Sequence, residues 1–124
     1  MPNRKLVVVV DDDAGMRRSV ARLLRQFGYA SLAFSSAEAF RNHGDFGNAA
    51  CIILDINLGD GSGIDLGLHL KAAGSSIPVI YITGNETPAV RSDAQASGCI
   101  AFITKPFSAQ ELMVPLQSAA ARFA

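Results

Sequence analysis

The sequence predicts an α/β fold: one domain built on a doubly wound parallel sheet of five strands, with five helices. Three observations support this prediction. Five short apolar segments alternate with segments of helical periodicity along the whole chain. The chain has 124 residues, a length that suits a single domain with one core. Apolar residues make up 49% of it and tryptophan is absent, a balance typical of compact α/β proteins.

Five apolar segments are predicted to be the strands of this sheet. Runs of valine, isoleucine and leucine are typical of strands buried on both faces, and only the second segment is more polar. The predicted strands span residues 6–10, 29–34, 51–55, 78–82 and 100–103. Because parallel strands need right-handed crossover connections, helices are expected on both faces of the sheet.

The segments between the strands are predicted to be helices. In the first, residues 16–27, the apolar side chains recur on one stripe and four arginines lie outside it. A short second helix is expected to begin at a capping box of Ser35 and Glu38, before a polar connection over residues 42–48. The third and fourth helices are predicted at residues 64–73 and 88–97. The last runs from a second capping box, Ser108 with Glu111, to Arg122.

Glycine and proline predict where helices end and bend. A glycine after a helical pattern is expected to end the helix, and three residues fit: Gly28, Gly74 and Gly98. Thr87 and Pro88 suit the start of the fourth helix. The glycine-rich residues 59–63 are expected to be the most flexible loop of the chain. Pro115 is expected to kink the last helix, because proline has no backbone N–H to donate.

Polar residues stand at the carboxyl ends of four predicted strands. They are Asp11 and Asp12, Asp55, Thr83, and Lys105. Because the carboxyl ends of parallel strands meet at one edge of a sheet, these side chains are expected to lie close together. Neighbouring carboxylates repel each other, and a hard divalent cation between them relieves the repulsion. Oxygen ligands suit Mg²⁺, so the pattern predicts a magnesium site.

A carboxylate, a metal ion, a hydroxyl and a lysine together predict phosphoryl transfer. Asp55 is the candidate nucleophile and would form an aspartyl phosphate. The metal and Lys105 would neutralise charge on the phosphoryl oxygens, and the Thr83 hydroxyl would donate a hydrogen bond to one of them.

Each of these residues also has an ordinary structural explanation. Asp13 is better explained as a helix N-cap than as a ligand, and Asp11 or Asp12 could cap as well. Thr83 alone is an ordinary residue at a strand end, and Lys105 alone an ordinary surface lysine. Only the placement of all the groups at equivalent strand ends favours a functional site.

Composition argues against several other classes of protein. Basic and acidic residues number 11 each, so no nucleic-acid or membrane surface would attract the domain overall. No segment approaches the ~20 apolar residues of a membrane span, and the N-terminal apolar run is too short for a signal peptide. Cys51 and Cys99 are expected to be reduced within the core. A cytoplasmic location is therefore expected.

Two other kinds of site are not supported. The glycines at 59, 61 and 63 follow the third strand and do not have dinucleotide-binding spacing. His43 and His69 have no cysteine or carboxylate at metal-ligand spacing.

Several motifs of the chain together resemble one known family. They are Val8-Val9-Val10-Asp11-Asp12-Asp13 with Met16-Arg17, Leu54-Asp55 with Gly63, Pro78-Val79-Ile80 with Thr83-Gly84, and Phe102-Ile103-Thr104-Lys105-Pro106-Phe107. The chain resembles the receiver domain of two-component response regulators over residues 1–124. The resemblance implies a flavodoxin-like fold, with a five-stranded parallel sheet of order 2-1-3-4-5 and five helices.

The resemblance implies a role for each acidic residue of the site. Asp55 matches the phosphoacceptor, which takes a phosphoryl group from the phosphohistidine of a histidine kinase. Asp12 matches the direct Mg²⁺ ligand, and Asp11 its neighbour that acts through water. Asp55 is also an expected Mg²⁺ ligand, and the backbone carbonyl of Asn57 matches the remaining one. Asn57 and Asn85 are expected to influence the access of water to the phosphoryl group.

The resemblance also implies a conformational switch. Thr83 and Lys105 match the pair that binds the phosphoryl oxygens. Phe102 matches an aromatic residue that turns inward when the threonine is drawn to the phosphoryl group, a two-state element biased by local charge. The Lys105–Pro106 bond is implied to be cis. Such a domain catalyses only its own phosphorylation and dephosphorylation and is not otherwise an enzyme.

The implied partners are a sensor histidine kinase or phosphotransfer protein, and an output domain or effector. The kinase-docking surface is expected to include Ala14, Gly15 and Arg18 on the first helix. The chain departs from the family at Leu58-Gly59, where Met-Pro is common, and this puts the rigidity of the loop in question. Pro115 lies on the usual dimerisation face, so dimerisation stays open.

Two rival hypotheses remain. A haloacid-dehalogenase-like phosphatase also uses an aspartyl phosphate, but its D-x-D-x-T/V motif lacks its final residue in the run that starts at Asp11. A receiver-like interaction domain without phosphorylation would need a missing site residue, and none is missing.

Overall fold

The protein folds around a five-stranded parallel sheet, as the sequence predicts. The computed structural model describes residues 5–44, 46, 47 and 49–121. The strand order is β2-β1-β3-β6-β7, and all neighbours are parallel. The strands are β1 (Leu6–Val10), β2 (Ala30–Phe34), β3 (Cys51–Asp55), β6 (Val79–Thr83) and β7 (Ala101–Thr104). Because β6 and β7 are the fourth and fifth strands of this sheet, the order is the predicted 2-1-3-4-5.

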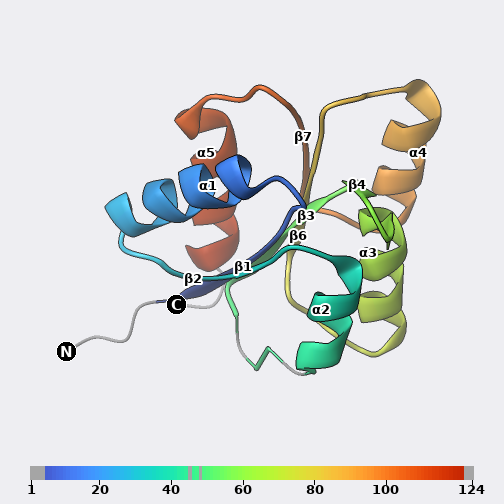
Figure 1. Cartoon of the computed structure of the whole chain (residues 1–124), viewed down its shortest axis with the longest axis horizontal. Helices are drawn as coiled ribbons and strands as arrows, with labels where there is room; N and C mark the ends of the chain where they lie inside the picture. Colours follow the sequence, from blue (N-terminus) through green and yellow to red (C-terminus); the bar gives the residue numbers. More distant parts are fainter. Residues whose placement is uncertain (1–4, 45, 48, 122–124) are drawn as a thin grey trace.

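Five helices cover both faces of the sheet (Figure 1). They are α1 (Ala14–Gln26), α2 (Ala37–His43), α3 (Gly63–Ala72), α4 (Pro88–Ala96) and α5 (Ala109–Ala121). α1 and α5 lie on one face, and α2, α3 and α4 on the other. No helix in the described part of the chain is long and apolar enough to span a membrane. The predicted end of the last helix at Arg122 lies outside the described residues.

Alternating side chains of the central strands form two cores, one on each face of the sheet. In β3, Ile52 and Leu54 pack beneath α2, α3 and α4, while Cys51 and Ile53 pack beneath α1 and α5. Every residue of β3 is buried. This strand therefore holds its last residue, Asp55, rigidly at the edge of the sheet. Both cysteines are free, as predicted, but Cys99 precedes β7 and is only half-buried.

Most of the predicted helix ends are confirmed. The glycines after α1, α3 and α4 have positive φ angles, as a left-handed helix end requires. The Asp13 side chain caps α1 by accepting from the amides of Gly15 and Met16. Ser108 and Glu111 form the predicted capping box, each side chain bonded to the other's backbone N–H. α5 continues as one helix through Pro115, and the kink stays a prediction.

The predicted capping box of Ser35 and Glu38 is wrong. The N-cap of α2 is Ser36, whose Oγ accepts from the amide of Ala39. The amide of Glu38 donates instead to the carboxylate of Asp60, from a distant loop. Local spacing could not reveal a partner 22 residues away in the sequence.

Two predicted connections are also corrected. α2 extends to His43, so the start of the predicted connection over residues 42–48 is helical, while residues 45 and 48 lie outside the described part of the chain. Residues 59–63, which were expected to be the most flexible loop, are instead largely ordered into secondary structure. They form the turn and the second strand of an antiparallel pair, β4 (Asn57–Leu58) and β5 (Gly61–Ser62), and the first residue of α3. Asp60, between them, is hydrogen-bonded to α2.

A close contact between α3 and β6 predicts a coupled pair of substitutions. The Tyr81 side chain is 1% exposed, and its hydroxyl lies 2.9 Å from Ser97 Oγ, which donates to the carbonyl of Ala94. A Cβ at Gly67 would lie 1.9 Å from that hydroxyl oxygen. Gly67→Ala is therefore expected to reduce the free energy of unfolding by about 1–3 kcal/mol through overpacking.

Tyr81→Phe removes the clashing oxygen but leaves the ring carbon Cζ 3.0 Å from the added Cβ, so it should rescue Gly67→Ala in part. We expect the double variant to be less destabilised than the sum of the two single variants, as measured by urea unfolding. Additive changes in the free energy of unfolding would contradict a clash between the Cβ of Gly67→Ala and the Tyr81 hydroxyl.

Candidate functional site

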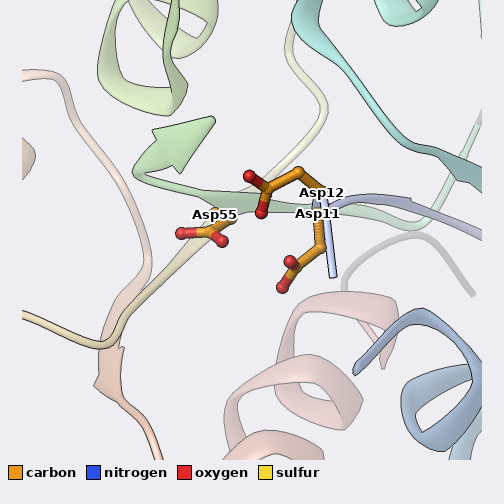
Figure 2. A group of neighbouring side chains, drawn as sticks. All are labelled: Asp11, Asp12 and Asp55. Carbon is orange, nitrogen blue, oxygen red and sulfur yellow. The ribbon is translucent and has the colours of Figure 1, made fainter. Parts of the chain in front are cut away.

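Three carboxylates meet at the carboxyl edge of the sheet. Asp11 and Asp12 follow β1, and Asp55 ends β3. Figure 2 shows their carboxylate groups turned toward a common space, and one ligand atom from each lies within 4.8 Å of the others. Asp11 and Asp55 are buried, whereas Asp12 is exposed. The structure therefore brings together the acidic residues that the sequence singled out.

Lys105 bridges two of these carboxylates. It follows β7, and its Nζ lies 3.0 Å from Asp11 Oδ2 and 3.1 Å from Asp55 Oδ2. The Lys105 side chain is 20% exposed. The Lys105–Pro106 bond is cis, as the resemblance implies. The Lys105 ammonium thus compensates for part of the negative charge of Asp11 and Asp55, and the lysine side chain stays partly exposed to solvent.

Burial and hydrogen bonding act in opposite directions on the charges of the site. Burial raises the pKa of the Asp55 carboxyl above its ordinary value, although the amide of Asn57 and the Lys105 ammonium both lower it. Burial also disfavours the charged form of Lys105. The hydrogen bonds and charges of Asp11 and Asp55 outweigh this, so the pKa of Lys105 is raised overall. Lys105 is therefore charged at neutral pH.

Thr83 is completely buried at the end of β6, beside Asp55. Its Oγ1 accepts hydrogen bonds from Asn57 Nδ2 at 3.2 Å and from the amide of Asn85 at 3.1 Å. With both acceptor positions used, the hydroxyl proton is what Thr83 can still donate. Asn57 also donates its own amide to Asp55 Oδ1 at 3.0 Å. Asn57 thus contacts both Thr83 and Asp55, and the backbone of Asn85 contacts Thr83. Their influence on the access of water stays a prediction.

Asp13 and Phe102, two further residues considered in the sequence analysis, lie around the carboxylate cluster. Asp11 Oδ1 accepts from the amide of Asp13 at 2.9 Å, while the Asp13 side chain faces α1 as its cap. Asp13 therefore has the structural role. Phe102 in β7 is partly buried, and the guanidinium of Arg91 lies 5.0 Å from its ring centroid. Its role as a switch stays a prediction.

Sequence reasoning missed one contact of the turn that follows β1. Arg17 Nη1 donates to the backbone carbonyl of Asp11 at 2.7 Å. The helical pattern placed Arg17 outside the apolar stripe, which indicates only that it is not in the core. Its place in the matched Met16-Arg17 motif was the one available signal.

The residues present fit a hard divalent cation. Three carboxylate oxygens within one small space are the donors that Mg²⁺ prefers, and the exposure of Asp12 leaves room for the waters that Mg²⁺ retains. No second cluster of this kind exists among the described histidine, cysteine, aspartate and glutamate residues.

Removal of the lysine charge should shift the titration of the site. Lys105→Met is expected to raise the pKa of the Asp55 carboxyl further, because the variant loses a hydrogen bond and an attractive charge that favour ionisation. A pH titration followed by NMR of the aspartate carboxyl carbons, without divalent cations, would measure the shift. Lys71→Met, on the exposed side of α3, is the control. Equal titration of Asp55 in both variants would contradict the prediction.

Comparison with known protein families gives one consistent match. The family model for the response regulator receiver domain matches residues 7–117. The response regulator protein TodT of Pseudomonas putida is 32% identical over 114 residues, covering 92% of this chain and 50% of TodT. Nodulation protein W of Bradyrhizobium diazoefficiens is 34% identical over 119 residues, covering 96% and 52%. The chain thus spans about half the length of these curated relatives.

Comparison with solved structures agrees with the sequence matches. The BeF3-activated receiver domain of DrrB, from Thermotoga maritima, superposes with a TM-score of 0.87 at 25% sequence identity, covering 97% of this chain and all of that one. The phosphatase alternative finds no support in these matches. Its second acid would be Asp13, which caps a helix in this structure.

Proposed function

This chain belongs to the response regulator receiver domain family, a signalling switch of two-component systems, and we propose that Asp55 is its phosphoacceptor. The observation that carries this proposal is the Lys105 ammonium. It bridges Asp55 and Asp11 beside a third carboxylate, at the solvent-open edge of the sheet. A buried nucleophile with a fixed cation on one oxygen is suited to accept a phosphoryl group.

The chemistry assigned to the site is one phosphoryl transfer. An oxygen of Asp55 forms a bond to phosphorus, the bond from phosphorus to the histidine nitrogen of the donor breaks, and the electron pair stays on that nitrogen. Asp11, Asp12, Asp55 and the backbone carbonyl of Asn57 would hold Mg²⁺. When bound, the cation supplies positive charge that stabilises the transferring oxygens. Lys105 supplies a second positive charge from the protein.

Thr83 and Phe102 are proposed to convert this chemistry into a conformational change. The Oγ1 of Thr83 accepts from Asn57 and Asn85, and its hydroxyl proton can be donated to a phosphoryl oxygen. Phe102, which is only partly buried, is the proposed second member of the switch. Two arrangements of these side chains would then be biased by the charge on Asp55.

The proposed partners follow from the family. A sensor histidine kinase or phosphotransfer protein supplies the phosphoryl group, and an output domain or effector responds. The domain itself binds neither nucleic acid nor membrane, acts in the cytoplasm, and catalyses only its own phosphorylation and dephosphorylation. Dimerisation through the last helix stays open because of Pro115.

Incubation with a small phosphoryl donor tests the proposal. Acetyl phosphate with Mg²⁺ is expected to add the mass of one phosphoryl group to the intact chain, and a chelator should prevent it. No gain of mass would reject phosphorylation and favour an interaction domain. Steady hydrolysis of a small phosphate ester would instead favour a phosphatase.

A further inference from the structure

The carboxylate of Asp60 ties the loop after Asp55 to helix α2. Asp60 Oδ1 accepts from the amide of Ala37 and Asp60 Oδ2 from that of Glu38, each at 2.9 Å. The side chain of Ser36, the N-cap residue directly before the helix, satisfies only the amide of Ala39. The two hydrogen bonds lower the pKa of Asp60, so it is ionised at neutral pH. α2 is thus capped in part by a residue that belongs to the loop of the candidate site.

Asp60 stands at the tip of a hairpin that borders the site on two sides. At the base of the hairpin, the side chain of Asn57 donates to Thr83 and the backbone N–H of Asn57 donates to Asp55. At the tip, a Cβ built on Gly59 would lie 3.8 Å from Asp12 Oδ2. Any movement of this hairpin would therefore displace groups that contact Asp55 and Thr83 and that lie near Asp12.

The base of the hairpin is held by the buried side chain of Leu58, which is 7% exposed, and by the hydrogen bonds of Asn57. The tip depends more on the tie to α2. β4 and β5 pair over only two residues each, and an isolated pair of strands is marginally stable even when longer. Three glycines lie within residues 59–63 and no proline, so the loop loses much conformational entropy on folding. Hydrogen bonds from backbone N–H groups to a carboxylate are stronger than neutral ones, and the start of a helix favours negative charge.

We propose that Asp60 is a positioning residue of the phosphoacceptor site: its carboxylate holds the Asn57–Gly61 turn against Asp12, Asp55 and Thr83. This inference rests on the proposed function. At Leu58-Gly59 the loop lacks a proline, and the Asp60 carboxylate, anchored on α2, supplies rigidity instead.

Asp60→Ala removes both hydrogen bonds, and Asp60→Asn keeps one acceptor oxygen. The matched control is Asp93→Ala, an exposed acid whose side chain makes no hydrogen bond or ion pair within the described residues. Without metal, we expect amide hydrogen exchange in Asp60→Ala to rise at residues 57–62 and at Ala37 and Glu38, and to stay unchanged in β3. A generally destabilised protein would exchange faster in β3 as well.

Metal titration gives the second measurement. The dissociation constant for Mg²⁺, followed by NMR, should rise by about threefold to tenfold in Asp60→Ala, since the loop must then be ordered on binding. The dissociation constant of Asp60→Asn for Mg²⁺ should lie between those of the wild type and Asp60→Ala. Phosphorylation by acetyl phosphate should fall at limiting Mg²⁺ and recover at saturating Mg²⁺.

The outcomes separate this inference from the proposed function. If the wild type is phosphorylated while Asp60→Ala and Asp93→Ala match it in loop exchange and Mg²⁺ affinity, the positioning role is overturned and the function stands. If the wild type neither binds Mg²⁺ nor gains mass, the function fails, and loop exchange alone then decides the role of Asp60. Faster exchange throughout the chain in Asp60→Ala and Asp60→Asn would also overturn the inference.

Discussion

Asp55→Asn is expected to abolish phosphoryl incorporation from acetyl phosphate and, at the same time, to increase the stability of the metal-free protein at neutral pH. The loss of incorporation follows because the amide oxygen of asparagine is a poor nucleophile and cannot form the acyl phosphate. Mass spectrometry of the intact chain measures this effect directly.

The gain in stability follows from the raised pKa of Asp55. Burial raises the pKa of this carboxyl in the folded state above its value in the unfolded chain, so the folded state binds the proton more tightly. The ionised carboxylate therefore lowers stability at neutral pH, and this cost disappears as the pH falls through the folded-state pKa. Asparagine has nearly the same shape and no charge, and Lys105 retains Asp11 as a partner.

Urea unfolding at several pH values, without divalent cations, measures this difference. The difference in the free energy of unfolding between variant and wild type should shrink in acid, where Asp55 is protonated in both the folded and the unfolded state. It should also shrink when Mg²⁺ binds and stabilises the wild type. Asp13→Asn is the matched control, because asparagine caps a helix as well as aspartate does. A variant less stable than the wild type at neutral pH would contradict the burial argument.

Gly63→Ala is expected to destabilise the fold and disturb the site together. A Cβ on Gly63 would lie 2.1 Å from the backbone oxygen of Asp55, where the amide of Gly63 donates to the carbonyl of Ile56 at 3.0 Å. The clash involves backbone, so no side chain can rotate away. We expect a loss of about 1–3 kcal/mol in the free energy of unfolding and a melting temperature lower by about 4–12 °C.

Gly61→Ala tests whether the position matters rather than the loss of a glycine. A Cβ there would make an ordinary contact, 3.6 Å from the Cβ of Ala37, so its stability should change by less than about 0.5 kcal/mol. Scanning calorimetry compares melting temperatures, and acetyl phosphate labelling compares the sites. Equal melting temperatures for the two variants would show that the loop can move aside.

The main lines of the fold and the core of the site were predictable from sequence because they depend on short-range patterns. An apolar run that ends at Asp55 predicts a buried strand, and parallel strands necessarily bring their carboxyl ends to one edge. The same rule predicts that Lys105 and Asp11 meet, although they are 94 residues apart in the chain. Helix ends such as Gly28 and the Ser108–Glu111 box were also predictable, since their partners lie within a few residues.

Only the tertiary structure decided the contacts that hold the site in place. Ser35 and Ser36 are equally good caps by composition, and which of them caps α2 depends on Asp60 arriving from another loop. The hydrogen bond from Arg17 to the Asp11 carbonyl likewise appears only once α1 has docked. Such contacts depend on how packed elements approach one another, and residue spacing does not encode that approach. The chemistry proposed for Asp55 therefore follows from the sequence itself, whereas the contacts that Asp60 and Gly63 make beside it were determined by packing.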